Sequence, residues 1–472
     1  MSNRLPRLAL RLSALSIVLA APAAHATGFL VDQYGADEGQ PALGNAYSVF
    51  FNPAAMAGAQ GTDLMIDGMA FGRQLSFNRS SAALSPNPAT PAGQSPDPTY
   101  VAANTGQAQL FNVLAAPYLG MVTDFGGSHW RLGIAGYVPF GGTVSWSKNQ
   151  VFQNYPGAPG AYDGAQRWAT ISTNSASMYG TAALAYRFEQ AHLGIGANVS
   201  VIRTTIQDTR ARNPDGSDNV LTPANGIAEG RATIDMSGVE VGAALGAYWE
   251  PTSALRLGAS YTSQPNFGTM RLSGTFHQWN QGADGGVEKA DMLQAYPDVI
   301  RLGAAWRVAK DAELRLDGSW QRWSQFKDQC IVLAGSSCNV DATGAQLAGS
   351  QIVANVPRNF QDAYKIRLGA AYWLQPQTEI FGSGAFETSP VTSAYEDPLL
   401  FDSVRLYGTL GVRESFTPHF YAMAAYTYVY MLPVTVTDSA FNTYKGVSRT
   451  PAEDGSYSSD LFIFDLALGY LF

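Results

Sequence analysis

Charged residues, histidine and cysteine are all scarce in this chain of 472 residues. Asp, Glu, Lys and Arg together make up 14% of it, whereas about 25% is typical of soluble globular proteins. After the first 26 residues no apolar run reaches about 18 residues, which excludes a membrane-spanning helix there. The 48 glycines and 23 tyrosines are numerous instead. For an exported chain this composition favours a transmembrane β-barrel, with a soluble periplasmic protein as the alternative until strands are counted.

The N-terminus has the pattern of a secretory signal peptide. Arg4, Arg7 and Arg11 provide a basic start, residues 12–20 are apolar, and Ala24-His25-Ala26 fits a signal-peptidase site. The apolar run is too short to anchor the chain in a bilayer. We therefore expect residues 1–26 to be removed, so that the exported chain begins at Thr27.

The charge balance and the few histidines argue against two classes of function. The net charge of −8 becomes −11 when a leader with three arginines and no acids is removed, which argues against a nucleic-acid partner. Four histidines remain, and none shares a strand face with a serine and an acid in the alternation that a catalytic site needs. We expect no enzyme activity, no metal and no cofactor, and an outer-membrane barrel enzyme is only a remote alternative.

The last strand of the chain has the two faces of a membrane barrel strand. Alternate residues are large and apolar, whereas the positions between them include Asp465, Ala467 and Gly469; the apolar set is Phe462, Phe464, Leu466, Leu468, Tyr470 and Phe472. An edge strand of a soluble sandwich is the alternative for this segment alone. A final phenylalanine is typical of bacterial outer-membrane barrels, so Phe472 is expected to engage the barrel assembly machinery.

The spacing of strand-like segments predicts an all-β, fourteen-stranded antiparallel barrel, because short turns and long polar joins alternate. Pro265 can divide one of the segments. The fourteen predicted strand segments are 62–77, 110–124, 129–146, 174–189, 191–206, 232–250, 253–276, 297–309, 311–325, 361–374, 376–388, 403–416, 418–436 and 459–472.

Three strands share an Arg-Leu-Gly-Ala phrase whose arginine and glycine face inward. The arginines are Arg256, Arg301 and Arg367. They could bind a ligand carboxylate in the lumen, or they could pair with inward acids such as Glu313 and Asp317. Small inward residues leave room inside the barrel for something other than strand side chains.

Residues 27–61 lack a strand pattern yet contain apolar residues, which need a buried place. A fourteen-stranded barrel is wide enough to hold a plug. We therefore predict a hatch at 27–61 inside a barrel formed by 62–472.

Several motifs are similar to one transporter family. Gly28-Phe29 opens the exported chain, Asn52-Pro53-Ala54 precedes the first strand, and Phe472 ends the last one. With the segments 137–143, 320–326, 359–364 and 386–391, these resemble the FadL/TodX family of hydrophobic-compound transporters. The resemblance implies a monomeric outer-membrane barrel of a Gram-negative bacterium that carries long-chain fatty acids or aromatic or aliphatic hydrocarbons. The chain departs from the family pattern in a shortened hatch and in a short, polar loop at 207–231.

The family resemblance also implies where the ligand moves. It would meet the hatch near Phe29, Asn52, Pro53 and Ala54, and leave sideways into membrane lipid where the third strand kinks. Pro139, Phe140, Gly141 and Gly142 fit such a kink, because proline lacks an N–H and glycine tolerates unusual backbone angles. The alternative is a strand that ends at Val138.

Cys330 and Cys338 lie close together in a predicted external loop, which favours a disulfide in an exported protein. A general or substrate-specific porin for polar solutes is the main alternative function, and the apolar plug argues against it.

Overall fold

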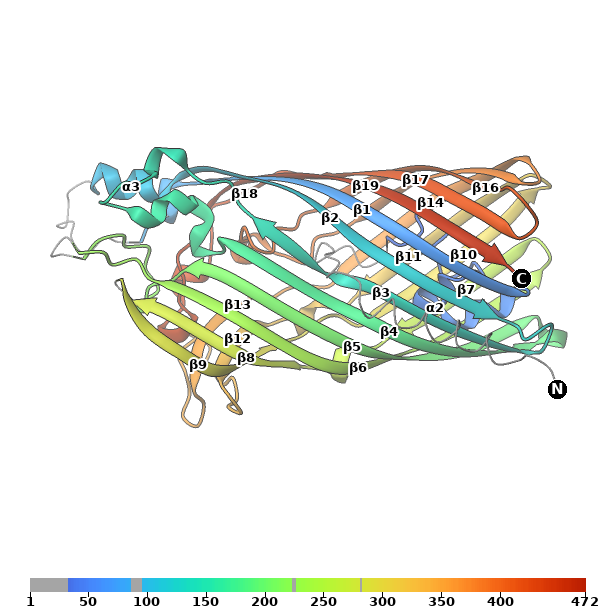
Figure 1. Ribbon diagram of the computed structural model, residues 1–472, viewed down its shortest axis with the longest axis horizontal. Coiled ribbons are helices and arrows are strands. Elements are labelled where there is room, and N and C mark those ends of the chain that lie inside the picture. Colours follow the sequence, from blue (N-terminus) through green and yellow to red (C-terminus); the bar gives the residue numbers. More distant parts are fainter. Residues whose placement is uncertain (1–32, 86–95, 223–225, 281) are drawn as a thin grey trace, which may run out of the picture.

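The computed structural model describes residues 33–85, 96–222, 226–280 and 282–472. The predicted signal peptide and Phe29 lie outside these ranges. The described strands form one antiparallel sheet that closes on itself, so the predicted fourteen-stranded barrel is confirmed (Figure 1). In the membrane-spanning wall, β19 (Gly455–Leu471) pairs with β1 (Thr62–Arg79) along its whole length and closes the seam.

Nineteen strand segments make up the fourteen strands of the wall, because five wall strands consist of two segments in line. The undivided strands, besides β1 and β19, are β2 (Gly106–Thr123), β3 (Trp130–Ser145), β4 (Ser172–Phe188), β5 (Leu193–Ala211), β6 (Arg231–Thr252), β15 (Thr378–Glu387) and β16 (Arg405–Ser415). The divided ones are β7 (Leu255–Thr262) with β8 (Met270–Asn280), β9 (Ala283–Gln294) with β10 (Val299–Ala309), β11 (Ala312–Gln321) with β12 (Asp328–Leu333), β13 (Ile352–Pro357) with β14 (Ala363–Gln375), and β17 (Phe420–Met431) with β18 (Val434–Val436).

Helices are short and lie in the N-terminal segment, in turns and in loops. The α-helices in the described ranges are α2 (Ser48–Phe51) and α3 (Pro98–Asn104). The 3-10 helices are η1 (Pro53–Gly58), η2 (Ser81–Ala83), η3 (Gln150–Phe152), η4 (Pro159–Asp163), η5 (Ala165–Trp168), η6 (Glu189–Ala191), η7 (Pro265–Phe267), η8 (Trp323–Gln325), η9 (Ser393–Tyr395), η10 (Phe441–Thr443) and η11 (Gly446–Ser448). Within the described residues, no helix has both the length and the apolar character needed to cross a membrane.

The strands alternate as their sequence predicts. In β19, Phe464 and Leu466 are exposed on the outer face, whereas Asp465 and Ala467 are buried on the inner face. Leucines and aromatic residues of the other strands repeat this pattern, which places a wide apolar surface around the barrel.

Two of the predicted long loops are wrong. Residues 277–296 and 326–360 contain the hairpins β8–β9 and β12–β13, which continue the wall beyond the aligned ends of β7, β10, β11 and β14. These extensions expose polar or charged residues, for example Glu288 and Lys289. They lack the apolar outer face by which the membrane-spanning strands were recognised. At the junction the four neighbouring wall strands all break, at 263–269, 295–298, 322–327 and 358–362.

Candidate functional site

The barrel wall is interrupted between β2 and β3. These strands pair only from Tyr118 to Thr123 and from Leu132 to Tyr137, although β2 begins at Gly106. On its other side β3 pairs with β4, and that register shifts between Tyr137 and Phe140. Val138 and Pro139 therefore lie in a bulge that turns the outer half of β3 away from β2.

Local sequence explains why β3 bends at this point. Pro139 has no N–H to donate to a neighbouring strand. Gly141 adopts φ +150°, and a Cβ atom on it would lie 2.6 Å from the carbonyl oxygen of Ser175. Only glycine fits there. Farther out the strands meet again, since the N–H of Ser147 donates to the carbonyl of Gln109 at 2.9 Å.

The ring of Phe140 packs in an aromatic cluster at the level where the four neighbouring wall strands break. It stacks on Tyr296 with 4.5 Å between the ring centroids and contacts Trp323 edge-on at 6.2 Å. Buried neighbours include Phe326, Phe360 and Val391. The cluster places buried aromatic rings next to the bulge in β3.

Residues 33–61, which we call the hatch, pack inside the barrel near the end where the chain terminates (Figure 1). Inward glycines of several strands make room for this segment. A Cβ on Gly258 would lie 2.0 Å from the carbonyl oxygen of Pro41, and one on Gly196 would lie 2.6 Å from the backbone N of Ala54. Gly133, Gly246, Gly303 and Gly369 also face hatch atoms within 3.4 Å.

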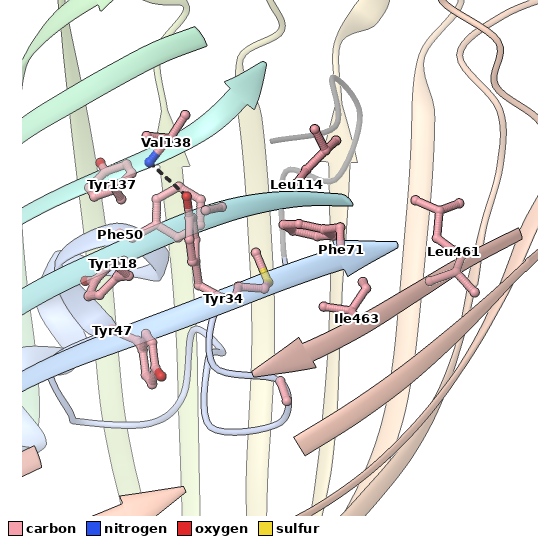
Figure 2. Close-up of a cluster of buried hydrophobic side chains, with 14 of the residues drawn as sticks. Tyr34, Tyr47, Phe50, Phe71, Leu114, Tyr118, Tyr137, Val138, Leu461 and Ile463 are labelled. Atoms are coloured by element: carbon pink, nitrogen blue, oxygen red, sulfur yellow. Dashed lines mark hydrogen bonds between the residues drawn. The ribbon is translucent and has the colours of Figure 1, made fainter. Parts of the chain in front are cut away.

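Tyr34 joins the hatch to the kink. Its phenolic oxygen accepts a hydrogen bond from the backbone N–H of Val138 at 2.8 Å (Figure 2). Its ring lies edge-on to Phe50 at 5.5 Å between centroids and tilted against Tyr118 at 5.3 Å. An N–H that the bulge removes from the β-ladder is thereby satisfied by the hatch.

The predicted hatch residues Asn52, Pro53 and Ala54 are fully buried and hold the hatch in shape. The side-chain oxygen of Asn52 accepts from the N–H of Ala54 at 3.1 Å and so caps η1, whose first residue is Pro53. Its amide donates to the carbonyls of Pro41 at 2.9 Å and Ala247 at 3.0 Å. These contacts join two parts of the hatch to β6.

The predicted lumenal arginines contact acids and the hatch. Arg256 pairs with Glu313, and Arg367 pairs with Asp317 at 2.7 Å. Arg367 also donates to the carbonyls of Ala36 and Gly39 at 2.6 and 2.7 Å. In this arrangement Arg256 and Arg367 serve the structure, as the pairing alternative describes.

Arg301 also contacts the hatch. Its guanidinium lies 4.8 Å from the centroid of the Phe50 ring and donates to the hydroxyl of Thr262 at 3.0 Å. Arg315, which the sequence did not single out, contacts Glu38 of the hatch at 2.8 Å and Glu379 at 2.6 Å. Cations of the wall therefore clamp the acidic start of the hatch.

Buried ions also tie the external loops to one another. Arg79 pairs with Asp218 at 2.9 Å, both side chains being fully buried, and the hydroxyl of Tyr100 donates to the same aspartate at 2.7 Å. Between β15 and β16, burial raises the pKa of Asp402 to about 7 despite the Arg405 guanidinium at 3.1 Å. Burial likewise raises the pKa of Glu396 in that loop.

The two cysteines lie in the extended hairpin outside the main barrel. Cys330 belongs to β12, and its sulfur is bonded to that of Cys338 in the following loop. Among the described residues no cluster of three or more His, Cys, Asp or Glu side chains could hold a metal ion.

Sequence reasoning singled out Pro139 and its neighbours but missed the residues that connect the β3 bulge to the hatch. Tyr34, Tyr118 and Tyr137 stand among many tyrosines, and Tyr34 lies in a segment without periodicity. The inward glycines were the available signal, because they showed that the lumen holds backbone from elsewhere in the chain.

Comparisons with known proteins agree on one family and one fold. The family model of the outer membrane transport proteins (OMPP1/FadL/TodX) matches residues 17–472. A structure of a Pseudomonas aeruginosa FadL homologue is 18% identical and covers 96% of this chain and 100% of its own, with a TM-score of 0.73. The P. putida toluene transporter TodX is 15% identical over 94% and 99% of the chains, with a TM-score of 0.63. The Ralstonia pickettii toluene transporter TbuX is 13% identical over 94% and 98%, with a TM-score of 0.60. No curated protein sequence matches.

Proposed function

The chain belongs to the OMPP1/FadL/TodX family of outer membrane transport proteins, and from this premise we propose that it carries small hydrophobic molecules and releases them sideways through the wall at β3. Its location is the outer membrane of a Gram-negative bacterium. Toluene is the cargo of two proteins with the same fold, and monoaromatic hydrocarbons or long-chain fatty acids are the cargo classes we propose here.

The observation that carries the proposal is the interruption between β2 and β3. In lipid every backbone N–H and C=O needs a partner, so a barrel does not leave a strand pair open without a compensating use. Here the unpaired stretch of β2 lies beside the bulge at Val138 and Pro139. The aromatic cluster of Phe140, Tyr296 and Trp323 supports an apolar path to that point.

The proposed route ends in the membrane and does not pass through the hatch. Three contacts fix the hatch to the wall: Asn52 binds β6, Arg315 of β11 binds the hatch, and so does Arg367 of β14. Moving it as a whole would break several buried polar contacts at once. A lateral opening lets an apolar molecule reach lipid without this cost, and burial of its surface supplies about 25 cal/mol per Å².

Deletion of Pro139 tests this route. The β3–β4 register shifts by one residue at the bulge, so removing one residue restores continuous pairing and straightens β3 against β2. We expect uptake of radiolabelled toluene or hexadecanoate by a strain lacking the endogenous transporter to fall to background, while the barrel still assembles. Undiminished uptake by the folded deletion variant would overturn the lateral route.

The substitution Pro139→Ala is the matched control. It keeps the extra residue and therefore the bulge, and it returns one N–H to the backbone. We expect uptake close to that of the unaltered protein. Heat-resistant migration on gels shows for both variants that the barrel has folded.

A further inference from the structure

Glu240 of β6 is a buried carboxylate with no ion-pair partner among the residues that the structure describes. It is 4% exposed and faces the lumen between the outward residues Val239 and Val241. Within the described part of the chain the carboxylate has no ion-pair partner and no hydrogen bond of ordinary geometry, and the hydroxyl of Thr204 interacts with it. A buried carboxylate is costly unless a donor or a proton satisfies it.

The place of Glu240 connects it with the proposed path. Residues 238–242 of β6 pair with β5 but have no partner on their other side, because β7 ends at Thr262 and β8 begins at Met270. The carboxylate therefore lies at the level where the neighbouring wall strands break.

The polar neighbours of Glu240 lead to the kink in β3. Thr204 of β5 interacts with the carboxylate and shares a hydrogen bond of 3.0 Å with Ser177 of β4. Ser177 in turn is the β4 partner of Phe140. The rings of Tyr179 and Tyr296 lie within electrostatic range of Glu240.

At this site a hydrogen-bond acceptor, the Glu240 carboxylate, lies near the aromatic rings of Tyr179 and Tyr296. Thr204 can donate to the carboxylate, the hydroxyls of Tyr179 and Tyr296 lie within its electrostatic range, and no ion pair of the described chain includes Glu240. An apolar ligand that carries one hydroxyl or ammonium group could place its body against Phe140 and Tyr296 and donate to the carboxylate. A ligand carboxylate at the same position would meet like charge.

We propose that Glu240 is the specificity-determining residue for the cargo, and that it selects hydrophobic molecules with a hydrogen-bond donor over hydrocarbons and over carboxylates. This inference rests on the proposed function and adds a substrate class to it. The shared chemistry is one donor on an apolar body, supplied either by a neutral hydroxyl or by a cationic amine.

Four probes with the same ring test the inference by titration calorimetry on the detergent-purified full-length protein. They are p-xylene, 4-methylphenol, 4-methylbenzylamine and 4-methylbenzoate. We expect 4-methylphenol to bind about tenfold tighter than p-xylene, as one hydrogen bond to a charged group allows, and 4-methylbenzoate to bind most weakly. If 4-methylbenzylamine binds more tightly than 4-methylphenol, the donor that the site selects is a cationic amine.

Substitutions at Glu240 separate charge from hydrogen bonding. Glu240→Leu should abolish the advantage of 4-methylphenol, leave p-xylene within about twofold, and improve 4-methylbenzoate. Glu240→Gln keeps a carbonyl acceptor, so it should retain part of the advantage of 4-methylphenol and lose that of 4-methylbenzylamine. Glu288→Leu removes an exposed carboxylate from β9 and should change none of these affinities.

The outcomes distinguish this inference from the proposed function. If p-xylene does not bind at all, hydrophobic transport itself is contradicted, and the inference falls with it. If p-xylene binds but 4-methylphenol gains nothing, or if Glu240→Leu leaves its advantage intact, only the role of Glu240 is overturned. Heat-resistant migration on gels verifies that each variant is folded.

Discussion

The hydroxyl of Tyr34 in the hatch and the backbone N–H of Val138 in β3 form a hydrogen bond of 2.8 Å. Val138 stands in the bulge where the β3–β4 register shifts, so its N–H cannot join the regular ladder. The hatch supplies the missing acceptor, and Phe50 and Tyr118 pack around Tyr34 (Figure 2). The position of the hatch and the shape of β3 are thus physically linked.

Removing this hydroxyl should loosen the hatch. Tyr34→Phe keeps the ring but leaves the N–H of Val138 unpaired, which costs about 1–3 kcal/mol. We expect faster hydrogen exchange in residues 33–47 and around Val138. Tyr47→Phe is the control, because the Tyr47 hydroxyl donates to Asp67 at 2.8 Å and does not touch β3. Equal protection of Val138 in the Tyr34→Phe variant and the unaltered protein would contradict the link.

A side chain placed under the hatch should open the lumen to ions. Gly258→Val puts atoms where the carbonyl of Pro41 lies, whereas Gly408→Val meets no heavy atom within 4 Å of the new Cβ. We expect larger single-channel conductance in planar bilayers for the first variant and an unchanged, low conductance for the second. High, steady conductance of the unaltered protein would instead support a porin for polar solutes.

The external loop between β15 and β16 should be more stable in mild acid. An aspartate in an unfolded segment titrates near pH 4, whereas burial raises the pKa of Asp402 to about 7. The folded loop therefore binds the proton more tightly. The resulting stabilisation is complete below about pH 4 and is lost as the pH rises to about 7.

Limited proteolysis within 388–404 measures this effect between pH 5 and pH 8. We expect faster cleavage at the higher pH after correction for protease activity. Asp402→Asn should remove the part of the pH dependence that Asp402 contributes near pH 7, since the amide does not titrate, whereas Glu396 keeps its own contribution. Asp97→Asn, at an exposed position where the side chain accepts from the N–H groups of Thr99 and Tyr100, should leave the profile unchanged, and a flat profile of the unaltered protein would refute the prediction.

The C-terminal residue should matter for assembly more than for ligand choice. Phe472 exchanges two backbone hydrogen bonds with Thr62, of 2.9 and 3.4 Å, at the seam between β19 and β1. Deleting Phe472 removes both, and it removes the residue expected to engage the assembly machinery. We expect less folded protein in the outer membrane, measured by heat-resistant migration, with unchanged relative affinities of the remainder. Normal folded yield would contradict this role.

The sequence determined the wall of this protein because its information there is local. A side-chain period of two marks each membrane strand by an apolar outer face, as in Phe464, Leu466 and Leu468 of β19. The inward glycines likewise indicated that the lumen holds something other than strand side chains. The same rule failed for β8–β9 and β12–β13, because beyond the membrane no apolar outer face is required.

Only the tertiary structure decided which residues meet inside the barrel. Tyr34 and Val138 are 104 residues apart, and Arg367 reaches Ala36 across 331 residues. Such partners depend on strand register and on how an aperiodic segment folds, neither of which leaves a local pattern. For the same reason Glu240 attracts no attention in the sequence. Its proposed role in ligand selection follows from its surroundings, the break between β7 and β8 and the aromatic cluster beside β3.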